Sequence, residues 1–286
     1  MADRATNTKL SNTSDLEINP ATEDKQDDII TAINQSPEFL VEVAKGNIAW
    51  HSLVHKFGAA NLTTTIAPIT YSGVYQTPMT AQSLEFVSSN ANDISTGSGA
   101  REITVIGLDS SWNEVSQTVI TDGTTPVALN TDLIRLYRWY VSQSGTYATQ
   151  SMGSHAGILT IRAAGWGALW DIIPITPFMI GQSQVWVYTV PLGKTAYLLS
   201  KNIFTDTSKT ADIYFFQRPF ANDVTPPYTG TMRLIEREVG VQGGYNMITR
   251  SPKGPFIGPC DIWFMGKVSV GTSECSVEFE LLLVDN

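Results

Sequence analysis

Two histidines at a four-residue spacing are the first candidates for a functional site in this sequence. On a helix, His51 and His55 would share one face and could bind a metal ion. The surrounding IAWHSLVHKFG reads better as a strand. There the two imidazoles would lie about 13 Å apart, at roughly 3.3 Å per residue, whereas direct Zn–N bonds are about 2.1 Å long. We expect no metal site here, and we read His155, in GSHAG, as a loop residue.

Motifs for nucleophilic catalysis and phosphate binding do not occur in the sequence. Gly97-Ser98-Gly99 follows a polar loop, whereas a nucleophile elbow needs a buried strand before it. Gly193-Lys194-Thr195 could end a phosphate-binding loop, but Tyr188 stands where the first glycine would have to be. A hairpin turn is the better interpretation. We therefore predict that the protein is not an enzyme and needs no cofactor.

Carboxylates and amides gather in the predicted turns. A calcium site could be built from Asn90, Asn92 and Asp93, although their spacing does not match an EF-hand loop. A pair of acids for glycan cleavage stays open as well, because their separation in space would decide it. Aspartates in loops usually form turns, and that is our interpretation of the four candidates, Asp93, Asp109, Asp122 and Asp132.

Tryptophans outside regular strands are the candidates for contact with a partner or a glycan. Trp112 lies in a predicted turn, where it could fold back on its own sheet or dock elsewhere. Trp166 and Trp170 lie in GWGALWDIIPITP. That stretch is either an apolar connection between domains or an exposed patch that awaits a partner.

Composition describes a globular, weakly charged chain. Of its 286 residues, 42% are hydrophobic and only 16% are charged, and the net charge is −9. The low charge favours an all-β body or large surfaces buried against other chains. The negative balance argues against nucleic-acid binding, which needs clustered Lys or Arg.

The two cysteines are predicted to be free, buried thiols. If residues 270–273 form the turn of a terminal hairpin, Cys275 lies opposite about Val268 and Cys260 opposite about Leu283, so the thiols do not face each other. That fits a reducing compartment.

Neither a signal peptide nor a membrane span is expected. The first residues, MADRATNTKLSNTSD, contain no apolar run. The most apolar neighbourhood, residues 163–180, is interrupted by Asp171, Pro174 and Pro177.

Residues 1–38 are predicted to form a flexible arm and a short helix. Asn19 can cap the helix, Pro20 suits its first position, and Pro37 closes the segment. A helix this short is marginal alone, so its apolar stripe of Ile29, Ile30 and Ile33 is expected to pack against another surface. It packs either on its own domain or against sister copies around a symmetry axis.

From Phe39 onward the hydrophobic period is two, which predicts an all-β fold. The absence of long helical patterns between the strands argues against alternating strands and helices. We predict two successive β-sandwich, jelly-roll-like domains at 39–165 and 178–286, with 166–177 as the connection. The expected strands are 39–43, 48–56, 84–88, 102–106, 115–120, 134–141, 158–162, 184–190, 195–203, 211–217, 232–239, 254–257, 261–270 and 274–284.

Three stretches resemble a β-rich virion protein of tailed bacteriophages that is frequent among aquatic phages. They are NPATEDKQDDII at 19–30, SSNAND…GSGAR…GLD within 88–109, and WVYTVPLGKTAYLL at 186–199. The resemblance covers about residues 16–205 and rests on structural turns, so it implies no site residue.

The resemblance implies a non-enzymatic structural component of a phage particle, assembled in the host cytoplasm in several copies. We expect a homotrimer that contacts other virion proteins as a capsid decoration, head fibre, or tail or neck component. A host-recognition adhesin that binds surface glycans is the alternative, and a glycan depolymerase is a weaker one.

Overall fold

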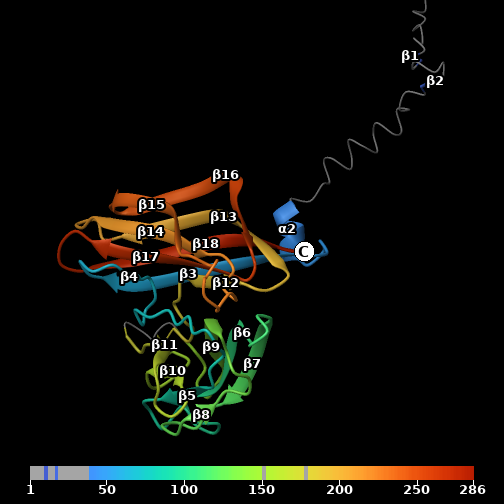
Figure 1. Cartoon of the computed structure of the whole chain (residues 1–286). Helices are drawn as coiled ribbons and strands as arrows, with labels where there is room; N and C mark the ends of the chain where they lie inside the picture. The colour runs from blue at the N-terminus through green and yellow to red at the C-terminus, as the bar shows by residue number, and fades with distance from the viewer. Residues whose placement is uncertain (1–9, 12–16, 19–38, 150–152, 177–179) are drawn as a thin grey trace, which may run out of the picture. The chain divides into compact units, whose positions relative to one another are not determined.

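The protein is an all-β molecule, as predicted (Figure 1). The computed structural model describes residues 10–11, 17–18, 39–149, 153–176 and 180–286. The chain divides into two compact units, residues 1–49 and residues 50–286. The predicted helix with Ile29, Ile30 and Ile33 lies outside the described residues.

The first unit contains two short strands and one helix among its described residues. Strands β1 (Leu10–Ser11) and β2 (Glu17–Ile18) pair antiparallel. Helix α2 (Phe39–Ala44) replaces the strand that the sequence predicts at 39–43, so that prediction is wrong. Gly46, at a φ of +77°, donates to the Val43 carbonyl and ends the helix, a conformation that glycine adopts without strain.

Within the second unit, two sheets form what we call the large lobe. One has the order β12-β17-β14-β15, with β4 paired to β17, and the other the order β16-β13-β18-β3. Their strands are β3 (His51–Leu62), β4 (Ala67–Pro68), β12 (Val187–Val190), β13 (Lys194–Thr205), β14 (Ala211–Arg218), β15 (Arg233–Val241), β16 (Gly244–Ile257), β17 (Cys260–Val268) and β18 (Ser273–Asp285).

Two further sheets form what we call the inserted lobe, because its strands lie between β4 and β12 in the sequence. One has the order β11-β10-β5-β8 and the other the order β7-β6-β9. Their strands are β5 (Leu84–Ser88), β6 (Ala100–Leu108), β7 (Glu114–Ile120), β8 (Val127–Ala128), β9 (Arg135–Ser144), β10 (Leu159–Ala163) and β11 (Leu169–Ile173).

The lobes are nested in the sequence, and this differs from the predicted order of two successive domains. Strand β3, which lies within the predicted first domain, pairs along its length with β18 near the other end of the chain, from His51↔Val284 to Leu62↔Ser273. The predicted connection at 166–177 contains β11, which pairs with β10. Hydrophobic period marks a strand but not its partner, so the boundaries could not follow from it.

Strand β18 shows why these residues form a sandwich. Its alternating side chains are all buried in the core of the large lobe: Cys275, Val277, Phe279, Leu281 and Leu283. Phe264 of β17 lies in the sheet that faces β18. It stacks on Trp186 with ring centroids 3.5 Å apart, and its ring centroid lies 5.6 Å from that of Phe279 in β18. Aromatic and aliphatic side chains from both sheets therefore fill one shared interior.

Both cysteines are free and buried, as predicted. The terminal hairpin assumed for them is wrong, because β17 pairs with β12, β14 and β4, whereas β18 pairs with β13 and β3. Burial raises the pKa of Cys260 and of Cys275 to about 12.

Candidate functional site: a buried ion cluster between the lobes

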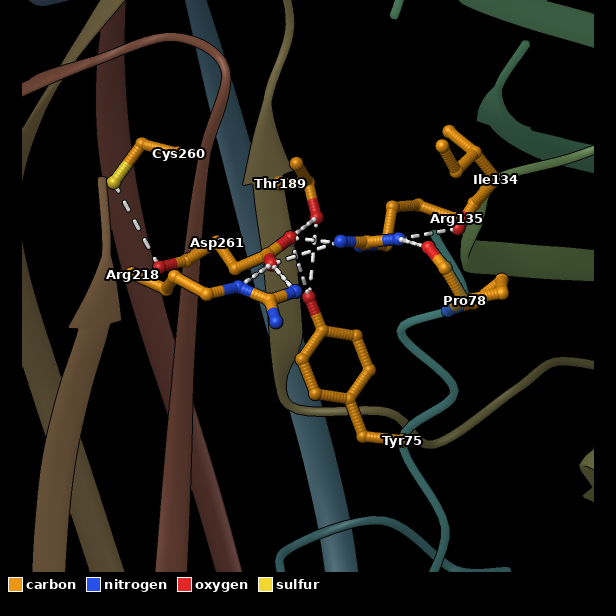
Figure 2. A network of polar contacts seen from close by, with 8 residues as sticks. All are labelled: Tyr75, Pro78, Ile134, Arg135, Thr189, Arg218, Cys260 and Asp261. Atoms are coloured by element: carbon orange, nitrogen blue, oxygen red, sulfur yellow. Dashed lines mark hydrogen bonds and ion pairs between the residues drawn. The ribbon is translucent and has the colours of Figure 1, made fainter. Parts of the chain in front are cut away.

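An ion pair joins the inserted lobe to the large lobe (Figure 2). Arg135 opens strand β9, and Asp261 is the second residue of β17. The guanidinium donates from Nε to Oδ1 at 2.8 Å and from Nη2 to Oδ2 at 3.0 Å. Their side chains are 1% and 0% exposed. The two planar groups thus meet with two parallel bonds, the geometry that arginine favours with a carboxylate.

Three other side chains of this cluster also donate to Asp261. Arg218, the last residue of β14, donates from Nε to Oδ2 at 2.9 Å and also from Nη2. Thr189 Oγ1 donates to Oδ1 at 2.7 Å, and the Tyr75 hydroxyl reaches the same oxygen at 3.1 Å. Figure 2 shows these groups converging on the carboxylate from separate segments. Asp261 is therefore the common acceptor of the junction.

The charges of the cluster keep Asp261 ionised. Burial alone would raise the pKa of this carboxyl, but the guanidiniums of Arg135 and Arg218 outweigh it and lower the pKa to about 2. Burial and the neighbouring Asp261 raise the pKa of Tyr75, so its hydroxyl stays a neutral donor. Such a cluster holds two lobes in register and has no proton to exchange near neutral pH.

Arg135 also binds groups of its own lobe and of the segment between the lobes. Its Nη1 donates to the Ile134 carbonyl at 2.6 Å and to the Pro78 carbonyl at 3.1 Å. Its guanidinium lies 4.9 Å from the ring centroid of Trp112, in a cation–π contact. The inserted lobe thereby positions the arginine from several sides.

A cavity of about 400 Å³ opens beside this cluster. Both arginines contribute to its wall. The remaining lining comes from the segment before β5 and from the loop between β14 and β15, namely Thr77, Pro78, Met79, Ala221, Asp223, Val224, Tyr228, Gly230, Thr231 and Met232. Guanidinium and apolar groups lie together there, so the cavity is suited to an amphipathic anion.

A second buried cation also reaches from one lobe to the other. Lys56 of β3 is 5% exposed, and its Nζ donates to the carbonyl of Tyr137 in β9. The ammonium also lies 5.5 Å from the Tyr137 ring centroid. Burial, reinforced by Arg138, lowers the pKa of Lys56 to about 7. A carbonyl and a ring do not supply a full counter-charge, so this ammonium is held at a cost in stability.

The three tryptophans predicted as contact candidates have different positions. Trp112 is 7% exposed and packs in the core of the large lobe, and Trp170 is 5% exposed in that of the inserted lobe. Neither indole is accessible to a glycan, which corrects their candidacy. Trp166 is 72% exposed, in the turn between β10 and β11. Among the three tryptophans predicted as contact residues, Trp166 is the one with an exposed side chain.

The histidines form no metal site among the described residues. His51 and His55 both lie on β3, as the strand interpretation predicts. His155 lies in a loop, as predicted, but is only 2% exposed, with Nε2 at 3.0 Å from the Pro174 carbonyl. Burial lowers the pKa of His155. No group of three metal-binding side chains occurs in the described part of the chain, and no helix there is long and apolar enough to span a membrane.

Asp93, weighed as a calcium ligand, binds backbone groups of its own lobe. Its carboxylate is fully buried and accepts from the nitrogens of Ala100, Ala156 and Gly157 at 2.7–2.8 Å, and from the Ser88 hydroxyl at 2.5 Å. A Cβ on Gly99 would lie 2.0 Å from Asp93 Oδ1, so only glycine fits there. The stretch SSNAND…GSGAR is therefore a loop organised by one aspartate.

Sequence reasoning missed the residues of the interlobe cluster. A signal was present in part: Asp261 interrupts the apolar run Cys260 to Phe264, and Arg135 stands between Ile134 and Leu136. A charge inside a buried strand needs a partner. Which partner it has depends on the fold, because Arg135 and Asp261 are 126 positions apart.

The fold and this cluster define an all-β protein of two nested lobes, linked through a buried ion cluster. No protein-family model matches the chain, and no curated protein matches it. Among solved structures, a chain from infectious bursal disease virus strain Gx is similar at 12% identity, with a TM-score of 0.23, over 82% of this chain and 71% of that one. A chain from strain Gt has 12% identity and a TM-score of 0.24, over 82% and 72%.

A chain from the VP2 subviral particle of the same virus has 12% identity and a TM-score of 0.20, over 82% of this chain and 72% of that one. At TM-scores of this size the likeness supports no argument about shared architecture or role.

Proposed function

We propose that the chain is a structural component of a bacteriophage particle that acts by assembly, without enzymatic turnover. It assembles as a homotrimer on the capsid, as a decoration or head fibre, or in the tail or neck, and it contacts other virion proteins. The stretches at 19–30, 88–109 and 186–199 support this proposal by their resemblance to tailed-phage virion proteins. The middle stretch builds a loop around Asp93, in keeping with a structural role for that motif.

The observation that carries the proposal is an edge strand, β15, that combines charged residues with exposed apolar side chains. Strand β15 is the last strand of its sheet, so one side of its backbone has no neighbouring strand in that sheet. Its side chains Leu234, Ile235 and Val239 are 51%, 37% and 65% exposed. The unpaired backbone groups of an edge strand can pair with another chain, and its charged side chains restrict which chain can do so. An obligate interface buries roughly 2,000 Å² or more, so these three side chains would be one part of a larger contact surface.

Light scattering with sedimentation velocity on the purified full chain tests the assembly. We expect a trimer at micromolar concentration, and Val239→Glu should weaken it because the new carboxylate would have to leave water. Val270→Glu, at a 61% exposed position in the turn between β17 and β18, is the matched control and should leave the trimer intact. A monomeric wild-type protein would remove the proposal.

A second candidate function, glycan recognition by an adhesin, is favoured by the geometry of Trp166. The Arg162 guanidinium lies 3.6 Å from the Trp166 ring centroid and covers one face of the indole. Glu85 pairs with Arg162 at 2.6 Å and also accepts from the backbone nitrogens of Gly165 and Trp166 at 3.0 and 3.2 Å. These contacts hold the exposed ring in place, and a fixed aromatic face can stack on a sugar.

A carbohydrate array distinguishes this candidate. Glycan binding that is lost in Trp166→Ala and kept in Trp50→Ala would favour the adhesin. Trp50 is the matched control because it is also 72% exposed but has no such cation–π contact among the described residues. Reducing-sugar release from a host polysaccharide would instead favour a depolymerase.

A further inference from the structure

The cavity beside the interlobe cluster has the charge and the walls of a ligand site. We propose that it binds a carboxylate carried on an apolar body, anchored by Arg218. This inference does not depend on the virion proposal, because it rests on the cavity alone.

The cluster next to the cavity carries an unbalanced positive charge. Arg135 and Arg218 share the single carboxylate of Asp261, so these three side chains sum to +1. The whole chain has 27 acidic and 18 basic residues, so its net charge is negative. The positive charge of this cluster is therefore opposite in sign to the net charge of the chain. A buried positive charge beside low-dielectric walls attracts an anion more strongly than an exposed charge does.

Arg218 is the member of the cluster that a ligand can reach. Its side chain is 28% exposed, compared with 1% for Arg135. Its Nε and Nη2 are used by Asp261, whereas Nη1 has no hydrogen-bond partner among the described residues and carries no dashed line in Figure 2. A carboxylate oxygen at Nη1 would complete the hydrogen bonding of this guanidinium.

The opposite walls favour an apolar body and a single charge. Met79, Val224 and Met232 line the cavity and are 61%, 38% and 61% exposed. Asp223 also lines it, with its carboxylate accepting from Thr229 N and Oγ1, both at 2.6 Å. That negative charge offsets the +1 of the cluster, so the cavity favours a single negative charge placed at Arg218 over a dianion such as phosphate. A monocarboxylate with a ring-sized or aliphatic body matches both walls.

The volume is adequate for such a ligand. Small-molecule sites typically measure about 300–1,000 Å³, and this cavity measures about 400 Å³. The carboxylate could belong to a free small molecule or to an acidic side chain of a sister copy. Both sources offer the same chemistry, so the test has an arm for each.

Calorimetric titration of the full chain with benzoate, against benzyl alcohol as the uncharged match, tests the inference. We expect benzoate to bind about tenfold or more tightly than the alcohol, since the difference is one charge-assisted hydrogen bond. Phosphate should bind more weakly than benzoate. Equal affinities for benzoate and benzyl alcohol, or no binding of benzoate, would overturn the inference.

Two substitutions locate the site. Arg218→Gln should abolish benzoate binding, with circular dichroism to verify folding, because this arginine also serves Asp261. Met232→Glu places a negative charge at an exposed wall position without touching the cluster, and it should also weaken benzoate binding. Val270→Glu, at a 61% exposed position that does not line the cavity, is the control and should bind as wild type does. Unchanged binding by Met232→Glu would sink the assignment.

Sedimentation velocity separates the two sources of the carboxylate. If benzoate and Met232→Glu each dissociate an oligomer, an acidic side chain of a sister copy occupies the cavity. If benzoate binds and the oligomeric state does not change, the cavity serves a free carboxylate.

Discussion

Arg135 and Asp261 stand 126 positions apart and meet in a two-bond ion pair whose side chains are 1% and 0% exposed. The pair links β9 of the inserted lobe to β17 of the large lobe. Because both charges are withdrawn from water, loss of Asp261 leaves Arg135 without a counter-charge, and loss of Arg135 leaves Asp261 with Arg218 as its remaining cation. The junction of the lobes therefore depends on this contact more than on any pair at the surface.

Substituting Arg135 by Met should lower the free energy of unfolding by about 3–5 kcal/mol, the range for breaking a buried pair. Urea denaturation of the full chain measures it. Arg237→Met is the control: this side chain is 47% exposed and pairs with Asp212 at 3.1 Å. Its loss should cost about 1 kcal/mol or less. Equal costs for the two variants would contradict the assigned role of the buried pair.

Stability should rise with pH between about 7 and 10.5 through Lys56. The pKa of its ammonium is about 7 in the folded chain, against 10.5 for an unperturbed lysine. In that window the unfolded chain binds the extra proton, so the penalty is full below pH 7 and fades as pH rises. Between pH 7 and 9 the gain should be on the order of 2 kcal/mol.

Urea unfolding of the wild type and of Lys56→Met at the two pH values isolates this contribution. The variant should lose the rise that Lys56 contributes, whereas Lys209→Met, at a partly exposed lysine, should keep it. A variant with the same pH dependence as wild type would refute the assignment.

Replacing Trp112 by Ala should destabilise the protein by about 3–5 kcal/mol, as for other buried tryptophans. The same change at Trp166 should cost about 1 kcal/mol or less, chiefly the cation–π contact with Arg162. The difference follows from exposures of 7% and 72%. Thermal unfolding compares the two, and a costlier Trp166→Ala would show that this indole has a structural role we have not assigned.

Asp93→Ala should destabilise the inserted lobe by about 3 kcal/mol, because it leaves buried backbone nitrogens without an acceptor. Hydrogen exchange should speed up at Ala100, Ala156 and Gly157, which donate to this carboxylate. Asp132→Ala, at an exposed acceptor of Ser83, is the control and should leave those rates unchanged.

Cys260 and Cys275 should resist alkylation at pH 8 while the protein is folded. Burial raises the pKa of each thiol to about 12, and the thiolate is the reactive form. In urea, iodoacetamide should modify both. Rapid modification of either thiol in the native protein would show that its surroundings open.

Local pattern was sufficient to predict most strands, and the reason is visible in β5 and β18. The predicted range 84–88 is identical to β5, and the predicted range 274–284 lies within β18, where buried residues alternate with more exposed ones. Strands of two residues carry no period, and β4 and β8 were missed for that reason. Helix α2 was mistaken for a strand because six residues of FLVEVA fit either period.

Long-range pairing was beyond the sequence for a different reason. No feature of the β3 or β18 sequence identifies the other as its pairing partner. Likewise, nothing in the sequence around Arg135 identifies Asp261 as its ion-pair partner. Of the three tryptophans predicted as contact residues, only Trp166 is accessible. Whether such a side chain is buried depends on which other segments pack against it, and the local sequence does not show this. Trp112 turns inward onto Arg135 and the core of the large lobe.

The pairing of β3 with β18 also sets the order in which the nascent protein can acquire structure. On the ribosome, β3 emerges before the inserted lobe, and its ladder partner, residues 273–284, emerges only after that lobe. The inserted lobe has all its strands available long before that, so it can close while synthesis continues. The large lobe must wait until residues 273–284 have been translated, and until then β3 lacks the strand that it pairs with along its length.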